Sequence, residues 1–197
     1  MKQLSIAFFL IVFISKGYGQ DIYKDSLTRY IDNYVEKHEV VTGEDKKQLH
    51  FYPVNEKYHI KARFEKVKDG KWFSVATSGT MKQVFRVYGT VYFTINDTAV
   101  KLNIYQSQRL MAVDEYKDNL FLPFTDLTTG YDTYAAGRYI DLVLSDVKNN
   151  TVVIDFNKAY NPYCAYVSGK YNCPIPPREN DLSVAILAGE KNYTKAH

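Results

Sequence analysis

Tyr-His-Ile-Lys-Ala-Arg-Phe-Glu, at residues 58–65, is the stretch of sequence that decides the fold class. Apolar side chains alternate with polar ones along it, which is the pattern of a β-strand with one buried face. Asp69-Gly70 follows as a hairpin signal, and residues 72–77 supply the returning strand. An antiparallel sheet is therefore expected to begin here.

The chain downstream repeats this strand-and-turn rhythm. Residues 84–95 are rich in β-branched and aromatic side chains, and Gly89 interrupts them as a bulge or bend would. Further strands are predicted at residues 99–105, 121–124, 139–144, 152–156 and 184–187. Strands do not alternate with helices, so a doubly wound fold is not expected. The pattern predicts one mainly β domain, an antiparallel β-sandwich or a small barrel.

A helix is predicted before the sheet. Leu27, Ile31 and Tyr34 recur at helical spacing within residues 21–38, which gives an amphipathic helix whose apolar face packs on the β domain. The expected organisation is an N-terminal helical segment at residues 20–48 and a β domain at residues 49–197.

The first residues have the features of an export signal. Lys2 precedes an apolar run at residues 4–14, and Gly17 and Gly19 form a small-x-small cleavage pattern before Gln20. The run is too short to cross a bilayer, which needs about 20 residues. The alternative is a buried N-terminal helix. The order of the three features favours a signal peptide at residues 1–19, no membrane span, and a periplasmic or secreted mature protein.

The charge of the chain excludes one class of partner. Removal of Lys2 and Lys16 with the signal peptide lowers the formal net charge from +3 to +1. The remaining basic residues are scattered along the sequence, with Lys46-Lys47 as the only basic pair. A nearly neutral chain offers no broad field for nucleic acid or anionic lipid, so nucleic-acid binding is not expected.

The region from residue 157 to residue 181 changes in character. It is rich in Pro and Tyr and contains the chain's two cysteines, Cys164 and Cys173. These features predict a long ordered loop, because flexible linkers rarely contain so many aromatic side chains. In an oxidising compartment the cysteines are expected to form a disulfide, which stabilises by about 2.7 kcal/mol in the chain-entropy model. A zinc site is the alternative, but the spacing and the lack of a nearby His oppose it, so no metal is predicted.

Polar residues around this loop suggest a ligand pocket at the strand ends. Its candidate polar groups and walls are Arg138, Asp155, Asn157, Tyr160, Asn161, Tyr166, Glu179 and Asn180. The competing interpretation is structural: buried Asn and Arg side chains satisfy the backbone of a loop that has no strand partners. Both interpretations stay open at this point, and no cofactor is predicted.

Several ordered motifs resemble one known family. They are Phe-Thr-Asp-Leu-Thr-Thr-Gly at 124–130, Thr-Tyr-Ala-Ala-Gly-Arg-Tyr at 133–139, Asp-Phe-Asn-Lys-Ala-Tyr-Asn-Pro-Tyr-Cys-Ala-Tyr at 155–166, Cys-Pro-Ile-Pro-Pro-Arg-Glu-Asn at 173–180, and Ala-Gly-Glu-Lys at 188–191. The resemblance is to the bacterial and archaeal family called domain of unknown function 1684, and it runs from about Leu49 to Lys191. It implies no activity.

No catalytic signature is present. The sequence contains neither a Gly-x-Ser-x-Gly elbow nor a phosphate-binding loop, and a pairing of Asp155 with Glu179 is a weak hydrolase signal. Whether the chain is an enzyme therefore stays open, as does its oligomeric state. The favoured hypothesis is an exported protein that binds a small molecule in a pocket covered by the 157–181 loop. The alternatives are an acid-residue hydrolase of the cell envelope and a structural or interaction protein of the envelope.

Overall fold

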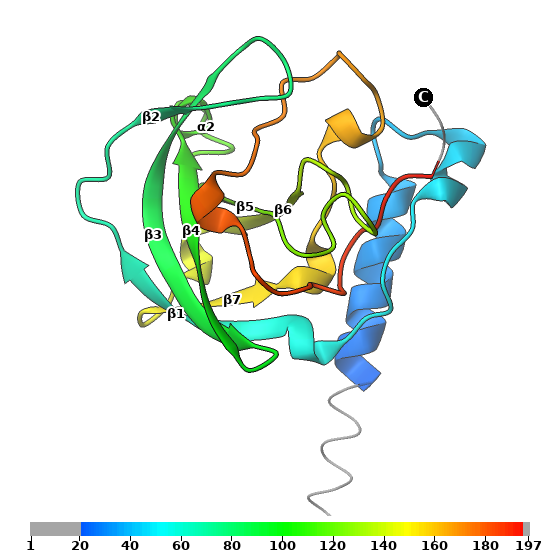
Figure 1. Cartoon of the computed structure of the whole chain (residues 1–197), viewed down its shortest axis with the longest axis horizontal. Helices are drawn as coiled ribbons and strands as arrows, with labels where there is room; N and C mark the ends of the chain where they lie inside the picture. Colours follow the sequence, from blue (N-terminus) through cyan, green and yellow to red (C-terminus); the bar gives the residue numbers. More distant parts are fainter. Residues whose placement is uncertain (1–20, 195–197) are drawn as a thin grey trace, which may run out of the picture.

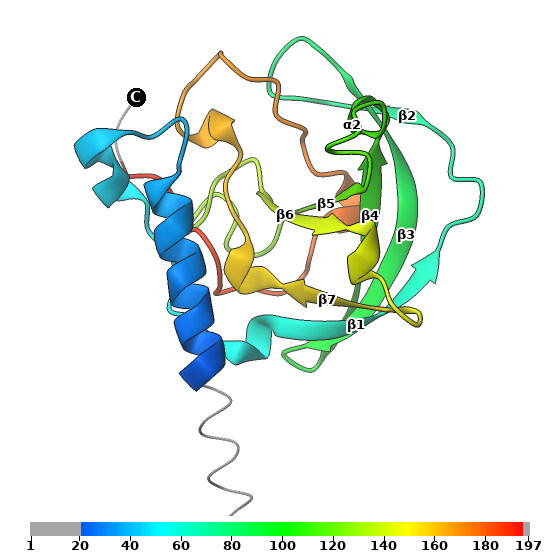
Figure 2. The same cartoon turned by 180° about the vertical axis from the view of Figure 1, so that it is seen from behind.

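The computed structural model describes residues 21–194, and the predicted signal peptide lies outside this range. The described chain opens with a helix over residues 21–36, which confirms the predicted N-terminal helix. Leu27 on its inner face is buried, and Tyr34 packs edge to face on Phe51. Figures 1 and 2 show the helix standing at one side of the β domain.

One antiparallel sheet forms the body of the protein. Its strands are β1 (His59–Lys66), β2 (Phe73–Val75), β3 (Gln83–Ile95), β4 (Thr98–Ser107), β5 (Asn119–Phe124), β6 (Arg138–Val143) and β7 (Thr151–Asp155). The order across the sheet is β6-β5-β4-β3-β1-β7, and β2 pairs with β3. The hairpin predicted at Asp69-Gly70 is wrong, because β1 and β2 both pair with β3 and not with each other. The mainly β prediction is confirmed, with a single curled sheet in the form of a half-barrel (Figure 1).

Short helices lie before, between and after the strands. They are α2 (Gln108–Met111) and the 3-10 helices η1 (Gly43–Gln48), η2 (Glu56–Tyr58), η3 (Leu144–Asp146), η4 (Phe156–Lys158), η5 (Tyr163–Ala165) and η6 (Arg178–Asn180). Within residues 21–194, none of the helices has the length and apolar character needed to cross a membrane.

The longest hairpin, β3–β4, shows how local sequence determines the curl. Asn96 and Asp97 both adopt positive φ at its tip, as a tight two-residue hairpin turn requires. The register shifts between Val87 and Gly89, which confirms the predicted bulge. A Cβ at Gly89 would lie 2.3 Å from the Phe64 ring, so only glycine allows β1 to pack this closely.

The two edges of the sheet meet outside the regular ladders. Tyr139 of β6 and Tyr160, which follows β7, exchange backbone hydrogen bonds of 2.9 and 3.0 Å. β4 and β5, by contrast, pair at the single register Tyr105↔Phe121. The half-barrel is therefore closed by hydrogen bonds between β6 and the segment after β7, whereas β4 and β5 diverge from each other.

The C-terminal segment completes the core without forming a strand. Leu182, Val184, Ile186 and Ala188 are all buried in the main hydrophobic cluster. The prediction of a strand at residues 184–187 is wrong, because this backbone forms no ladder: Ile186 O accepts from the Arg138 side chain, and Val184 O accepts from the backbone amide of Leu127. Burial alternates along the segment as it would along a strand, which explains the misleading sequence pattern.

The 157–181 loop is ordered and contains no strand, as predicted. Cys164 and Cys173 form a disulfide, which confirms the predicted pairing. Backbone bonds from Ser78 N to Cys173 O (2.9 Å) and from Ile175 N to Ala76 O (2.8 Å) join the loop to the connection that follows β2.

Candidate functional site

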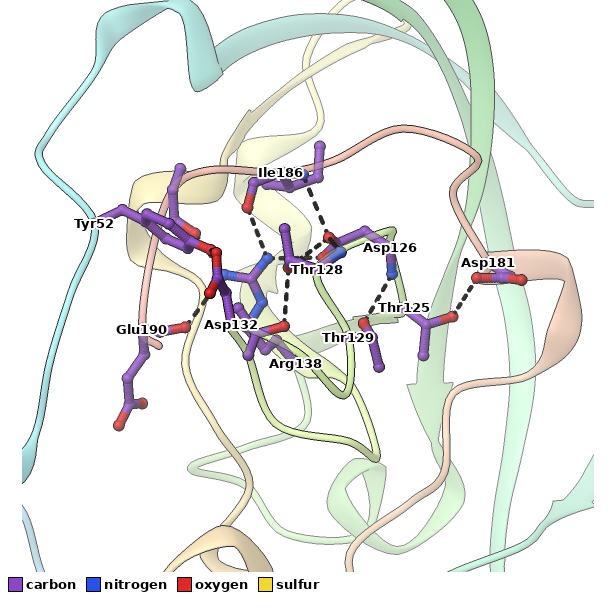
Figure 3. Close-up of polar contacts among 12 residues, drawn as sticks. Tyr52, Thr125, Asp126, Thr128, Thr129, Asp132, Arg138, Asp181, Ile186 and Glu190 are labelled. Atoms are coloured by element: carbon purple, nitrogen blue, oxygen red, sulfur yellow. Dashed lines mark hydrogen bonds and ion pairs between the residues drawn. The ribbon is translucent and has the colours of Figure 1, made fainter. Parts of the chain in front are cut away.

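The guanidinium of Arg138 is fully buried against the C-terminal segment (Figure 3). It forms an ion pair with Asp126 Oδ2 at 2.8 Å and donates to the carbonyls of Ile186, Ala188 and Glu190. Because these partners use both of its Nη groups, Arg138 fixes the path of a segment that has no ladder of its own, while its buried Nε has no hydrogen-bond partner among the described residues. The side chain of Glu190 points away from the guanidinium, which contacts only that residue's backbone oxygen (Figure 3).

Asp155 and Asn157 hold the N-terminal segment at the end of β7. Asp155 Oδ1 accepts from Tyr23 Oη at 3.0 Å and from Asn157 N at 3.1 Å. The Asn157 amide accepts from Asn55 N at 2.9 Å and donates to Asn55 O at 3.0 Å, in the manner of a strand partner. Both predicted site residues therefore form hydrogen bonds with the backbone around them.

Asn180 bridges the splayed strands β4 and β5. Its fully buried amide accepts from Asn103 N at 2.8 Å and donates to Asn103 O at 2.9 Å and Pro123 O at 2.6 Å. It replaces the ladder bonds that β4 and β5 lack. Glu179, its predicted neighbour in the site, is exposed.

Tyr160 donates to Asp141 Oδ2 at 2.8 Å on the outer face of β6. Asp141 is exposed, yet the protein crowded around it raises the pKa of its carboxyl by desolvation, against the lowering effect of the Tyr160 hydrogen bond. Such a carboxyl lies at an accessible but poorly hydrated position.

Asn161 and Tyr166 converge on the fully buried side chain of Glu190. Glu190 Oε2 accepts from Asn161 N at 2.8 Å and from Tyr34 Oη at 3.1 Å, and Oε1 accepts from Tyr166 Oη at 2.6 Å. Within residues 21–194, no cationic side chain forms an ion pair with this carboxyl. Desolvation raises the pKa of Glu190 to about 7, although the three hydrogen bonds oppose the rise.

A pocket of about 240 Å³ lies beside this carboxyl, between the N-terminal helix and the loop. We call it the helix pocket, and its lining residues are Tyr30, Asn33, Tyr34, Lys37, His38, Glu39 and Tyr163. The first four recur at helical spacing, so they share one face of the helix and its C-terminal end. Tyr163 comes from the loop, and its hydroxyl donates to Glu39 Oε2 at 2.9 Å.

His38 is the most distinctive residue of the helix pocket. Its side chain is 7% exposed, and its Nδ1 accepts from Val41 N at 2.9 Å and from Val40 N at 3.3 Å. Accepting at Nδ1 places the proton of the neutral ring on Nε2. Burial and, secondarily, the charge of Lys46 lower the pKa of His38, which favours that neutral form. Nε2 has no hydrogen-bond partner among the described residues.

The structure thus brings Asp155 together with Asn157, and Asn161 together with Tyr166, but none of the eight predicted residues lines the helix pocket. The residues that sequence reasoning missed are Glu190, Tyr34 and His38. Glu190 lies within the quoted 188–191 motif, which was its one available signal. Tyr34 was placed on the packing face of the helix, and no pattern marks His38. Among residues 21–194, no cluster of three or more His, Cys, Asp or Glu side chains could hold a metal ion.

Comparisons with known proteins identify the family and the fold. Residues 45–191 match the family described as "Protein of unknown function (DUF1684)". A solution NMR structure of the uncharacterized protein from gene locus rrnAC0354 of Haloarcula marismortui is similar, with 24% identity and a TM-score of 0.66. The alignment covers 91% of this chain and 99% of the archaeal one, and it shows a shared fold. No curated protein matches the chain.

Proposed function

The chain belongs to the DUF1684 family, and we propose that it is an exported protein that binds a small polar ligand in the helix pocket. The observation that carries the proposal is that His38 lines the pocket and that its buried Nε2–H has no hydrogen-bond partner among the described residues. A buried donor without a partner costs free energy comparable to a lost hydrogen bond. A ligand with an acceptor at this point supplies the missing partner.

The other walls define the chemistry of that ligand. Tyr30, Tyr34 and Tyr163 offer aromatic surface, while Asn33, Lys37 and Glu39 offer polar groups of both signs. A pocket of about 240 Å³ suits a molecule of about monosaccharide size. A sugar has this combination of one flat apolar face and many hydrogen-bonding groups, and it is the ligand class we propose.

Export is the second part of the proposal. The order of the features in residues 1–19 supports it, and so does the Cys164–Cys173 disulfide, because stable disulfides are typical of oxidising compartments. We propose a periplasmic or secreted location and cleavage before Gln20.

Intact mass is the first test. The protein, purified from the periplasm of an expressing bacterium, is weighed under native and denaturing conditions. We expect a mature chain that starts at Gln20, two hydrogens fewer than the reduced chain, and an excess mass that disappears on denaturation. A chain that keeps residues 1–19 refutes cleavage before Gln20, and a protein that is found in neither the periplasm nor the medium refutes export.

A defined probe panel then tests the pocket itself. Glucose, galactose and N-acetylglucosamine are titrated while the His38 ring nitrogens are followed by NMR. We expect Nε2 to carry the proton and to shift with one of these sugars. His38→Asn preserves an acceptor at the Nδ1 position and removes the donor, so binding should be lost while the fold survives. His50→Asn, at an exposed site, is the matched control. Binding that survives in His38→Asn, or a bare chain that responds to no sugar, refutes the proposal.

The carboxyl of Asp141 supports hydrolysis as a second candidate function. Its charge acts on Tyr30 and Tyr163, two residues of the helix pocket, and the pKa of its carboxyl is raised. A carboxyl with a raised pKa can donate a proton to a leaving group. Nitrophenyl glycosides of the same three sugars test this: turnover by the parent and none by Asp141→Asn supports the hydrolase, while no turnover by the parent removes it.

A further inference from the structure

The connection between β1 and β2 lies against β3 at its bulge. Val67 N donates to Tyr88 O at 3.1 Å, and Asp69 adopts a φ of 54° to turn the chain. A Cβ at Gly70 would lie 2.5 Å from the carbonyl oxygen of Val87, so only glycine allows this approach. A pocket of about 300 Å³ forms here, and Lys66, Lys68 and Arg86 line it together with Tyr88.

Positive charge is concentrated around this pocket. Residues 66–86 contain five basic side chains and one acidic side chain, a net charge of +4, whereas residues 20–197 as a whole carry +1. Lys66, Lys68, Lys71 and Arg86 form no ion pair in the described part of the chain. The net charge of the mature chain is therefore near zero only because acidic residues elsewhere balance the local positive charge of residues 66–86.

Arg86 is held in position before any ligand arrives. Its Nε and Nη2 donate to Gln106 Oε1 at 3.1 and 2.7 Å, and the Gln106 side chain is itself buried. The guanidinium lies 4.8 Å from the Trp72 ring. This arrangement orients the guanidinium and leaves its Nη1 without a hydrogen-bond partner among residues 21–194, which lowers the entropy cost of binding an anion.

Apolar aromatic surface lies beside the charge. Trp72 and Phe73 are each 38% exposed, immediately after Lys71 in the chain. The connection protrudes at the side of the molecule opposite the N-terminal helix (Figures 1 and 2). Aromatic side chains next to Lys and Arg are the combination that favours a membrane–water interface.

We propose that this basic surface at the β1–β2 connection, made of Lys66, Lys68, Lys71, Trp72 and Arg86, docks the protein on anionic phospholipid headgroups. The cations approach the phosphates, and the Trp72 ring enters the interfacial layer. A free phosphate in solution uses the same cations but gains nothing from the exposed aromatic surface. The site is distinct from the helix pocket, so either proposal can fail alone.

The chain's one tryptophan makes the test direct, since Trp72 reports on this surface without interference. The mature protein is mixed with phosphatidylglycerol vesicles or with phosphatidylcholine vesicles, and Trp emission and co-sedimentation are measured. We expect a blue shift and sedimentation with phosphatidylglycerol only, both reversed by salt. The triple variant Lys66→Gln/Lys68→Gln/Lys71→Gln should partition about a hundredfold less, at roughly fivefold for each lysine.

The control variant Lys24→Gln/Lys47→Gln/Lys148→Gln removes the same charge from exposed sites elsewhere and should bind like the parent. Equal loss in both triple variants overturns the proposal, because net charge alone would then explain binding. Equal binding to phosphatidylcholine, or none to phosphatidylglycerol, overturns it too. So does inorganic phosphate that shifts the emission by itself and releases the protein from vesicles, since the site would then hold a free anion.

Discussion

Replacing Glu190 with Gln tests how the buried carboxyl joins the N-terminal helix to the loop. The wild-type side chain accepts from Tyr34, Tyr166 and Asn161 and is fully buried. Gln has almost the same shape and still offers an oxygen acceptor, while the tyrosine hydroxyls can rotate to accept from its amide. The substitution therefore removes titration with little change in packing.

The size of the effect follows from the pKa. Burial raises the pKa of Glu190 from 4.5 to about 7, so the folded chain holds this proton more tightly than the unfolded chain. The resulting stabilisation is fully present below pH 4.5 and is lost as the pH rises through about 7. At about 1.4 kcal/mol for each pH unit, the loss is about 3 kcal/mol.

Urea unfolding followed by circular dichroism at closely spaced pH values between 4 and 9 measures this loss. The free energy of unfolding of Glu190→Gln minus that of the parent should rise by about 3 kcal/mol across this range. Glu179→Gln, an exposed carboxyl from the same region, should show no such rise. A difference that stays constant with pH for Glu190→Gln refutes the reasoning, since the carboxyl would then titrate normally.

Three further substitutions test the buried networks. Arg138→Gln leaves Asp126 without its ion-pair partner, and we expect urea unfolding to show a loss of about 3 to 5 kcal/mol, against almost none for the exposed Arg178→Gln. Asn180→Ala removes the amide between β4 and β5, so we expect a loss of about 2 to 3 kcal/mol and faster hydrogen exchange at the Asn103 amide; unchanged exchange there would contradict the bridging role. Cys173→Ser removes the disulfide and should lower the free energy of unfolding by about 3 kcal/mol. A variant with the same urea midpoint as the oxidised parent would disprove this.

The parts of the fold that could be predicted from sequence are those fixed by local physics. The alternation at residues 58–65 requires one buried face, and Asn96-Asp97 supplies the positive φ values that a tight hairpin needs. The strand predicted at residues 184–187 fails for a non-local reason. Its alternation is real, but the carbonyls of Ile186 and of the adjoining Ala188 accept from the Arg138 guanidinium and not from a neighbouring strand. The alternation of apolar and polar residues indicates which side chains are buried, but a strand ladder forms only where a neighbouring strand is available to pair.

The candidate site shows the same limit more strongly. The sequence correctly marks Arg138, Asn157 and Asn180 as unusual, and each one is a buried polar side chain. Each of them also has a partner 48 or more residues away, namely Ile186, Asn55 and Asn103, so sequence position could not distinguish a shared pocket from separate structural hydrogen bonds. The structural alternative accounts for these contacts within the protein.

The position of Glu190 decides which experiment tests the helix pocket cleanly. The pocket has one wall from the N-terminal helix and one from the loop, and the Glu190 carboxyl joins Tyr34 of the first to Tyr166 of the second. A change at Glu190 therefore affects a hydrogen-bonded contact between the walls as well as the stability of the fold, and any loss of binding has two explanations. His38→Asn removes the Nε2–H donor but keeps an acceptor for Val40 N and Val41 N, so the backbone contacts of the wall are retained. His38→Asn is consequently the substitution whose binding result reports on the ligand contact itself, and the Glu190 variant belongs to the stability measurement.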